Sequence, residues 1–217
     1  MTKTATLKKA APRANLDRIL QAASDLFTTQ GFHGTSTREI AARAGVSLGN
    51  IYNYFGNKEE LFVSLLESRE KEYFRPDQPL IKALSSTAFP DNIERLGFAS
   101  RETVEKFSAY ILLIYVDVVE FRARHVAKLF SSMRAGYAAA LKSAEAKPHH
   151  KPRSKVAPDI DPVAALMMVT WNYSNYFIME KLFKVKGHYG LADTEAIKLF
   201  ARVFKRGILA GGNNDHR

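Results

Sequence analysis

Apolar residues recur three or four positions apart along almost the whole of this 217-residue chain, and no stretch alternates convincingly as a strand does. That spacing gathers apolar side chains on one face of a helix. Capping residues, Pro and Gly predict helices over about 16–30, 36–45, 48–55, 58–75, 80–88, 101–121, 125–146, 161–185 and 193–209, with a further helix opening at Pro90 and ending at Gly97. Asn15 is the expected cap of the first helix. We predict an all-α fold.

Residues 36–55 carry the signals of two short helices joined by a tight turn. Ser36 and Glu39 have the spacing of a capping box, Gly45 permits the turn, and Ser47 can cap the second helix. The second helix has one apolar face and an uncharged outward face rich in hydrogen-bond donors, which suits a DNA major groove. The alternative is a three-helix packing unit in which the polar residues have no special role.

Residues 13–73 resemble the N-terminal domain of the TetR family of bacterial regulators through the pattern Phe27-x3-Gly31-Phe32-x2-Thr35-Ser36-x3-Ile40-Ala41-x2-Ala44-Gly45-Val46-Ser47-x-Gly49-x-Ile51-Tyr52-x-Tyr54-Phe55-x2-Lys58-Glu59-x-Leu61. Beyond residue 73 the resemblance extends only to the layout of helices. It implies a helix-turn-helix DNA-binding domain at 13–73 (motif 36–55) and a larger helical ligand-binding and dimerisation domain at 74–210, flanked by a flexible basic tail (1–12) and a disordered tail (211–217).

The resemblance implies DNA contacts for ten residues: Ser36, Thr37, Ser47, Leu48, Gly49, Asn50, Tyr52, Asn53, Tyr54 and Lys58. Thr37 and Ser47 would contact phosphate, and Tyr54 and Lys58 would clamp phosphates at the far end of the recognition helix, although the family often has His at the position of Tyr54. Leu48 would either touch thymine methyls or pack inward. Asn50 and Asn53 would either read adenine or contact only phosphate and water.

The charge distribution fits a polyanionic partner. The net charge is +10, and the segment from Met1 to Lys58 holds eight Lys or Arg residues against three acids. This sign fits nucleic acid or an anionic membrane surface. Lys3, Lys8, Lys9 and Arg13 would follow the DNA backbone, enter a minor groove or form a solvated tail.

The resemblance further implies a homodimer on a palindromic operator, formed by the helices at 161–185 and 193–209. Two apolar rows are the candidate interface, unless they pack within one monomer: Leu166, Val169, Tyr173, Tyr176 and Phe177, and Ile197, Phe200, Val203, Phe204 and Ile208.

An effector pocket within the C-terminal domain is also implied. Its candidate lining is Phe107, Tyr110, Ile111, Ile114, Tyr115, Phe130, Met133, Met167, Trp171 and Tyr176, which would suit an apolar or aromatic effector. The alternative is that these residues are plain core. Asp117 and Glu120 interrupt an apolar helix and would meet a cationic ligand, pair with Arg122 or Arg124, or lie exposed.

Other classes of protein fit the sequence less well. The absence of Cys excludes disulfides and Cys-ligated metals, and His149 and His150 are adjacent in a loop, so we expect no metal site. No Gly-rich phosphate loop or nucleophile motif suggests an enzyme or a cofactor. No apolar run spans a bilayer, so we expect a cytoplasmic protein. The predicted function is a sequence-specific transcriptional regulator, a repressor released by a small effector; the alternative is a constitutive or non-specific DNA-binding protein without a ligand.

Overall fold

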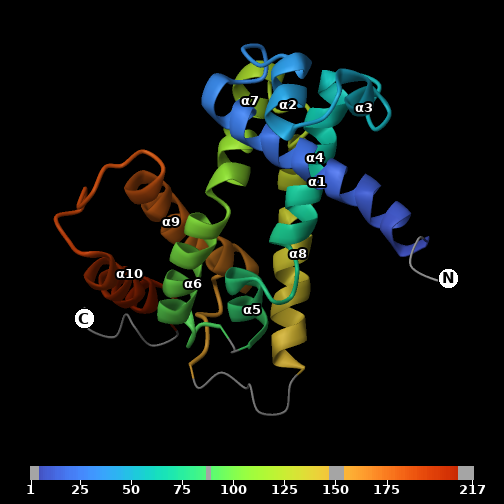
Figure 1. Cartoon of the computed structure of the whole chain (residues 1–217). Helices are drawn as coiled ribbons and strands as arrows, with labels where there is room; N and C mark the ends of the chain where they lie inside the picture. The colour runs from blue at the N-terminus through green and yellow to red at the C-terminus, as the bar shows by residue number, and fades with distance from the viewer. Residues whose placement is uncertain (1–4, 87–88, 147–153, 210–217) are drawn as a thin grey trace, which may run out of the picture. The chain divides into compact units, whose positions relative to one another are not determined.

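The computed structural model describes residues 5–86, 89–146 and 154–209. Within them the chain is helical and holds no strand, only an isolated bridge between Val156 and Leu209, so the predicted all-α fold is confirmed (Figure 1). The helices are α1 (Ala5–Gln30), α2 (Thr37–Ala44), α3 (Leu48–Tyr52), α4 (Lys58–Tyr73), α5 (Pro79–Ser86), α6 (Ile93–Lys106), α7 (Ser108–Phe121), α8 (Ala127–Glu145), α9 (Pro162–Lys181) and α10 (Asp193–Ile208). In the described part, no helix is both long and apolar enough to cross a membrane.

The chain divides into two compact units. The first contains residues 1–73 and 109–127, and the second contains residues 74–108 and 128–217. Helix α7 therefore groups with the N-terminal residues, although the sequence assigns it to the C-terminal domain. The predicted domain boundaries stay a prediction.

The first unit is built around the helix pair α1 and α4, with α2 packed on α1 and α3 on α2. Its core contains the apolar positions that the helical spacing predicts, among them Ile19, Phe27, Ile40 and Phe62, all fully buried. The rings of Phe27 and Phe62 meet edge to face with their centroids 5.4 Å apart. This core fixes the two short helices of the motif against a longer scaffold.

In the second unit, α6 packs against α5, α9 and α10. Gly97 lies inside α6, and a Cβ at this position would come within 2.8 Å of side-chain atoms of both Tyr173 and Ile197. The hydroxyl of Tyr173 donates to the carbonyl of Ile197 at 2.9 Å, which ties α9 to α10. The absence of a side chain at Gly97 thus lets three helices approach closely.

Several predicted helix ends are wrong. Gly97 does not end a helix, and the expected long helix over 101–121 is two helices divided at Phe107. Helix α1 begins at Ala5, and the Asn15 side chain accepts from Arg18 (2.7 Å) rather than capping a helix start. Helix α3 ends at Tyr52, before the expected Phe55. Parts of the predicted tails (residues 1–4 and 210–217), the side chains of Lys8 and Lys9, and His149 and His150 lie outside the described residues.

The apolar rows proposed as the dimer interface belong mainly to the protomer's own core. Eight of the ten are buried within the single chain: Leu166, Val169, Tyr173, Tyr176, Phe177, Ile197, Phe200 and Ile208. The apolar side chains that α9 does expose are Met168, Trp171 and Met179, and α10 exposes Val203. For these eight residues the structure therefore favours the alternative, packing within one monomer. Helical spacing alone did not decide between the two, because α9 is apolar on more than one face.

Candidate nucleic-acid interface

Helix α2 begins with the predicted capping box. The Ser36 hydroxyl accepts from the backbone N–H of Glu39 (3.2 Å), while the Glu39 carboxylate accepts from both the backbone N–H and the hydroxyl of Ser36 (2.8 and 2.7 Å). These bonds from Ser36 hold the pKa of Glu39 below its usual value. Gly45 ends the helix in the left-handed conformation with φ +64°, as a helix C-terminus favours. Both ends of α2 are thus fixed by residues close in sequence.

Helix α3 follows the turn and starts at Ser47, whose hydroxyl accepts from the backbone N–H of Asn50 at 3.2 Å. Ile51 is buried, whereas Gly49, Tyr52 and Asn53 are exposed. The α2–turn–α3 segment is therefore a helix-turn-helix with one anchored face and one outward polar face. Asn50 and Leu48 are half-buried, which leaves both interpretations of Leu48 open.

A hollow of about 480 Å³ lies beside this motif and brings together four of the predicted residues: Ser36, Thr37, Tyr52 and Lys58. The Thr37 hydroxyl lies 3.4 Å from the Tyr52 hydroxyl. The hollow also meets the start of α2, where backbone N–H groups and the helix dipole favour an anion. Its hydroxyls and N–H donors have the chemistry of a phosphate contact.

Five further residues line the same hollow and are absent from the predicted site: His33, Gly34, Thr35, Gly56 and Asn57. They lie in the turns before α2 and before α4. Thr35 is part of the sequence pattern, and Asn57 directly precedes the helix predicted over 58–75, where Asn favours a cap, so both were visible as structural residues. Their place beside Tyr52 depends on how the turns meet in space.

Lys58 has internal partners that the sequence does not reveal. Its ammonium donates to the carbonyls of Phe32 (2.8 Å) and Thr35 (2.7 Å) and lies 4.3 Å from the centre of the Phe32 ring. An ammonium has three N–H donors, so one is left for another acceptor. The predicted phosphate role of Lys58 stays a prediction, beside a structural role that the geometry makes plain.

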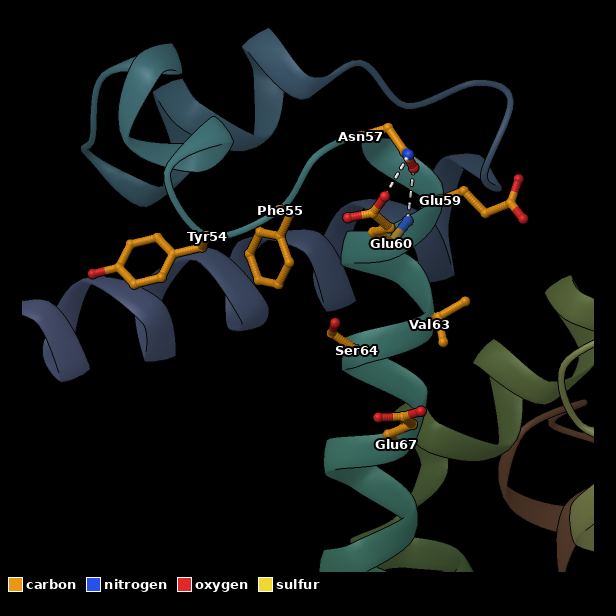
Figure 2. A pocket seen from close by; sticks show the side chains of 8 residues that line it. All are labelled: Tyr54, Phe55, Asn57, Glu59, Glu60, Val63, Ser64 and Glu67. Atoms are coloured by element: carbon orange, nitrogen blue, oxygen red, sulfur yellow. Dashed lines mark hydrogen bonds between the residues drawn. The ribbon is translucent and has the colours of Figure 1, made fainter.

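A second hollow, of about 510 Å³, lies along α4 and is lined by acidic side chains (Figure 2). Tyr54 and Phe55 line it together with Glu59, Glu60 and Glu67. Asn57 caps α4 here: its carbonyl accepts from the N–H of Glu60 (2.9 Å), and its amide donates to the Glu60 carboxylate (2.8 Å). Three carboxylates make this hollow unsuited to phosphate. Tyr54 thus lies apart from the other predicted phosphate contacts.

Comparison with known proteins agrees with this geometry. Residues 19–65 match the family described as bacterial regulatory proteins, tetR family. Residues 19–65 are thus similar to the N-terminal domain of that family. Over 64 residues it is 44% identical to the HTH-type transcriptional regulator RutR of Escherichia coli strain K12, a match that covers 30% of each protein. The chain therefore spans about a third of the length of that curated relative.

Two solved structures show the same fold over nearly the whole chain. The fatty acid degradation regulator FadR from Bacillus halodurans aligns with a TM-score of 0.63 at 19% identity, covering 93% of this chain and 97% of that one. FadR from Bacillus subtilis, solved in complex with stearoyl-CoA, aligns with a TM-score of 0.56 at 18% identity, covering 86% and 96%. At this identity the likeness establishes the fold, including the helical C-terminal part.

The residues predicted to line an effector pocket are divided between the two units of the chain. Tyr110, Ile111, Ile114 and Tyr115 belong to the first unit, and the other six belong to the second. Within the second unit, Phe130 and Trp171 meet edge to face at 6.0 Å, whereas Tyr176 is buried among Phe177, His188 and Phe200. The ring of Tyr176 is thus already used in packing. The pocket itself stays a prediction.

Proposed function

We propose that this chain is a transcriptional regulator that binds DNA sequence-specifically as a homodimer and is released from a palindromic operator by a small, largely apolar or aromatic effector. The observation that carries the proposal is the capped α2–turn–α3 segment beside the hollow of hydroxyl and N–H donors. No charged side chain lies on the outward face that α3 presents, between Gly49 and Asn53. Such a face can enter a major groove without meeting a fixed like charge.

In this proposal α3 enters the major groove, and the start of α2 contacts the phosphate backbone. Tyr52, which is 50% exposed, and Thr37 lie close enough to reach one strand together. Asn53 is exposed at the end of α3 and is free to approach base edges. Phosphate contacts would set the register, and the α3 side chains would supply the preference between sequences.

Two copies are needed because α3 has only five residues and buries little surface on DNA. We assign the dimer contact to the outward face of α9, where Met168 is 65% exposed and Trp171 50% exposed in the single chain. Met179 continues this face two to three turns further on. Each chain would contribute one reading head, the α2–turn–α3 segment. Two reading heads spaced by one turn of DNA, about 34–36 Å, would require a palindromic site.

The proposed effector is apolar because the candidate side chains are aromatic or aliphatic and supply few charges. The B. subtilis FadR was solved with stearoyl-CoA, and a further structural neighbour is the ketosteroid regulator KstR2 of Mycobacterium tuberculosis. These names support the choice of a ligand with a large apolar part. Binding would shift the protein towards a state with lower operator affinity, which requires a ligand that distinguishes the two states.

Selection of duplexes from a random pool tests the proposal. A specific regulator enriches a palindrome and keeps its preference as salt rises, whereas a non-specific DNA-binding protein enriches nothing and loses nearly all affinity. Tyr52→Phe, which removes one hydroxyl, should weaken binding to the selected duplex by about tenfold, in line with one lost hydrogen bond. The matched control is Tyr189→Phe in the second unit, also exposed. Enrichment of no sequence would overturn the proposal.

The effector is tested on the same duplex. Stearoyl-CoA is the first probe, with free CoA as the control that lacks the apolar chain. Loss of operator binding with the acyl compound alone supports an apolar effector. Unchanged binding with this and a panel of apolar and aromatic compounds would leave a constitutive binder and overturn the effector part.

A further inference from the structure

The carboxylate of Glu120, near the end of α7, binds the turn that joins α1 to α2. One oxygen accepts from the backbone N–H of Phe32 and the other from that of His33, both at 2.8 Å. The second oxygen also pairs with Nδ1 of the His33 ring. This contact joins residues almost ninety positions apart in sequence, and none of the roles expected for Glu120 includes it. A carboxylate that accepts hydrogen bonds from two backbone N–H groups holds them firmly, because both bonds are charge-assisted.

The turn is shaped to receive this carboxylate. Gly31 adopts φ +75°, and a Cβ there would lie 2.5 Å from the nearer Glu120 oxygen, so a larger residue would displace the side chain. Next to Glu120, the Phe121 ring packs on Phe32 with centroids 4.6 Å apart and stacks on Phe62 at 5.2 Å. Both backbone polar groups of Phe32 have partners: its N–H donates to Glu120, and its carbonyl accepts from Lys58.

The chain that follows α7 is also held by polar contacts. Asp117 is fully buried and accepts from the backbone N–H groups of His125 (3.2 Å) and Val126 (3.1 Å) and from the His125 ring (2.6 Å). Arg124 in this segment pairs with Glu59 at the start of α4. The end of α7 and the turn after it thus bind two segments. One is the turn before α2, which lines the proposed phosphate hollow; the other is the start of α4 at Glu59, next to Lys58 of that hollow.

We propose that Glu120 is the positioning residue that sets the start of α2 for selective DNA binding. The inference rests on the proposed function. Glu120 itself would touch no DNA; it holds Phe32 and His33, and Ser36 and Thr37 follow within four residues. Both ends of the 109–127 segment continue into the second unit along the chain, so movement of α7 is one covalent route by which that unit would act on the reading head. Release of the carboxylate would free two backbone N–H groups and let the turn change.

The test compares Glu120→Ala and Glu120→Gln with Glu67→Ala in the full chain. Glu67 is an exposed glutamate on α4, so its change removes the same charge. The probes are the duplex that the wild type selects from a random pool and a random duplex of equal length. Loss of a negative charge alone would slightly strengthen binding to both. We expect Glu120→Ala to bind the selected duplex at least tenfold more weakly, Glu120→Gln to fall between, and the random duplex to be bound almost as before.

Amide hydrogen exchange at Phe32 and His33 gives a second readout that needs no DNA. Both amides should lose protection in Glu120→Ala and keep part of it in Glu120→Gln, whose remaining carbonyl oxygen still accepts one bond. Equal affinities for Glu120→Ala and Glu67→Ala on the selected duplex would overturn the positioning role even if the wild type binds well. Wild-type amides without protection would overturn the contact itself. Failure of the wild type to select any duplex would instead remove the proposed function and, with it, the DNA-binding half of this inference.

Discussion

Lys58→Met separates the two roles of the Lys58 ammonium: the structural one, in which it binds two backbone carbonyls, and the predicted one, in which it binds a DNA phosphate. The substitution keeps most of the apolar stem and removes the donor that binds the carbonyls of Phe32 and Thr35 at 2.8 and 2.7 Å. Each hydrogen bond to a charged group contributes about 1.5–3 kcal/mol, and the lower figure applies because Lys58 is only half-buried. The cation over the Phe32 ring adds about 0.5 kcal/mol. We expect a loss of about 3.5 kcal/mol, which lowers the melting temperature by roughly 7–14 °C for a chain of this size.

Thermal unfolding followed by circular dichroism measures this loss, with Lys71→Met as the control. Lys71 is exposed on the same helix, so its replacement removes the same charge. If the third N–H of Lys58 also meets a phosphate, the slope of log affinity against log salt falls by about 0.9 in the Lys58 variant. An unchanged slope would leave Lys58 as a structural residue only. Equal melting temperatures for the two variants would refute the reasoning from the carbonyl contacts.

Three further predictions concern other parts of the chain. Gly97→Val should lower stability by about 2 kcal/mol, because the new side chain overlaps Tyr173 and Ile197; Gly136→Val, which enters open space, is the control for helix propensity in a melting comparison. Glu120→Gln should be less stable than the wild type at neutral pH. Although burial raises the pKa of Glu120, the bonds from His33 and Phe32 outweigh it and lower the pKa. The folded-state carboxylate therefore stabilises the protein at pH values above the usual glutamate pKa of 4.5, and this stabilisation is lost as pH falls through the lowered pKa. The melting temperatures of the two proteins should converge as pH falls through this range; a constant gap would contradict this. The double change Met168→Glu and Trp171→Glu should turn dimers into monomers in light scattering, whereas Ala139→Glu on exposed α8 should not; a persistent dimer would place the interface elsewhere.

The features that the sequence predicted well are those decided by neighbouring residues. The capping box of Ser36 and Glu39, the left-handed Gly45 and the cap at Ser47 are all present. Asp161 caps α9 through the N–H of Val163 at 2.9 Å, with Pro162 as its first residue. Each of these depends on atoms two to four residues apart, so the local pattern contains the whole interaction.

The features that the sequence did not predict depend on which distant segment becomes a neighbour. Helical spacing shows that Tyr173 and Phe200 are apolar and face one way, but it does not show whether that face meets another helix of the same chain or a second copy. Gly97 looked like a helix end for the same reason: its lack of a side chain serves the packing of α9 and α10, and nothing within α6 reveals this.

The size of the reading head explains why long-range polar contacts matter in it. A segment the size of residues 13–73, about 60 residues, buries a smaller share of its surface than a larger domain does and is marginally stable by its apolar core alone. Here Phe121 extends the core by packing on Phe32 and Phe62, and Glu120 and Lys58 fasten the same turn by its N–H and carbonyl groups. Helix α7 thus supplies both apolar surface and a carboxylate that residues 13–73 lack. A DNA-binding unit completed by a segment from the middle of the sequence depends on where that segment lies, and such dependence is what regulation through α7 would require.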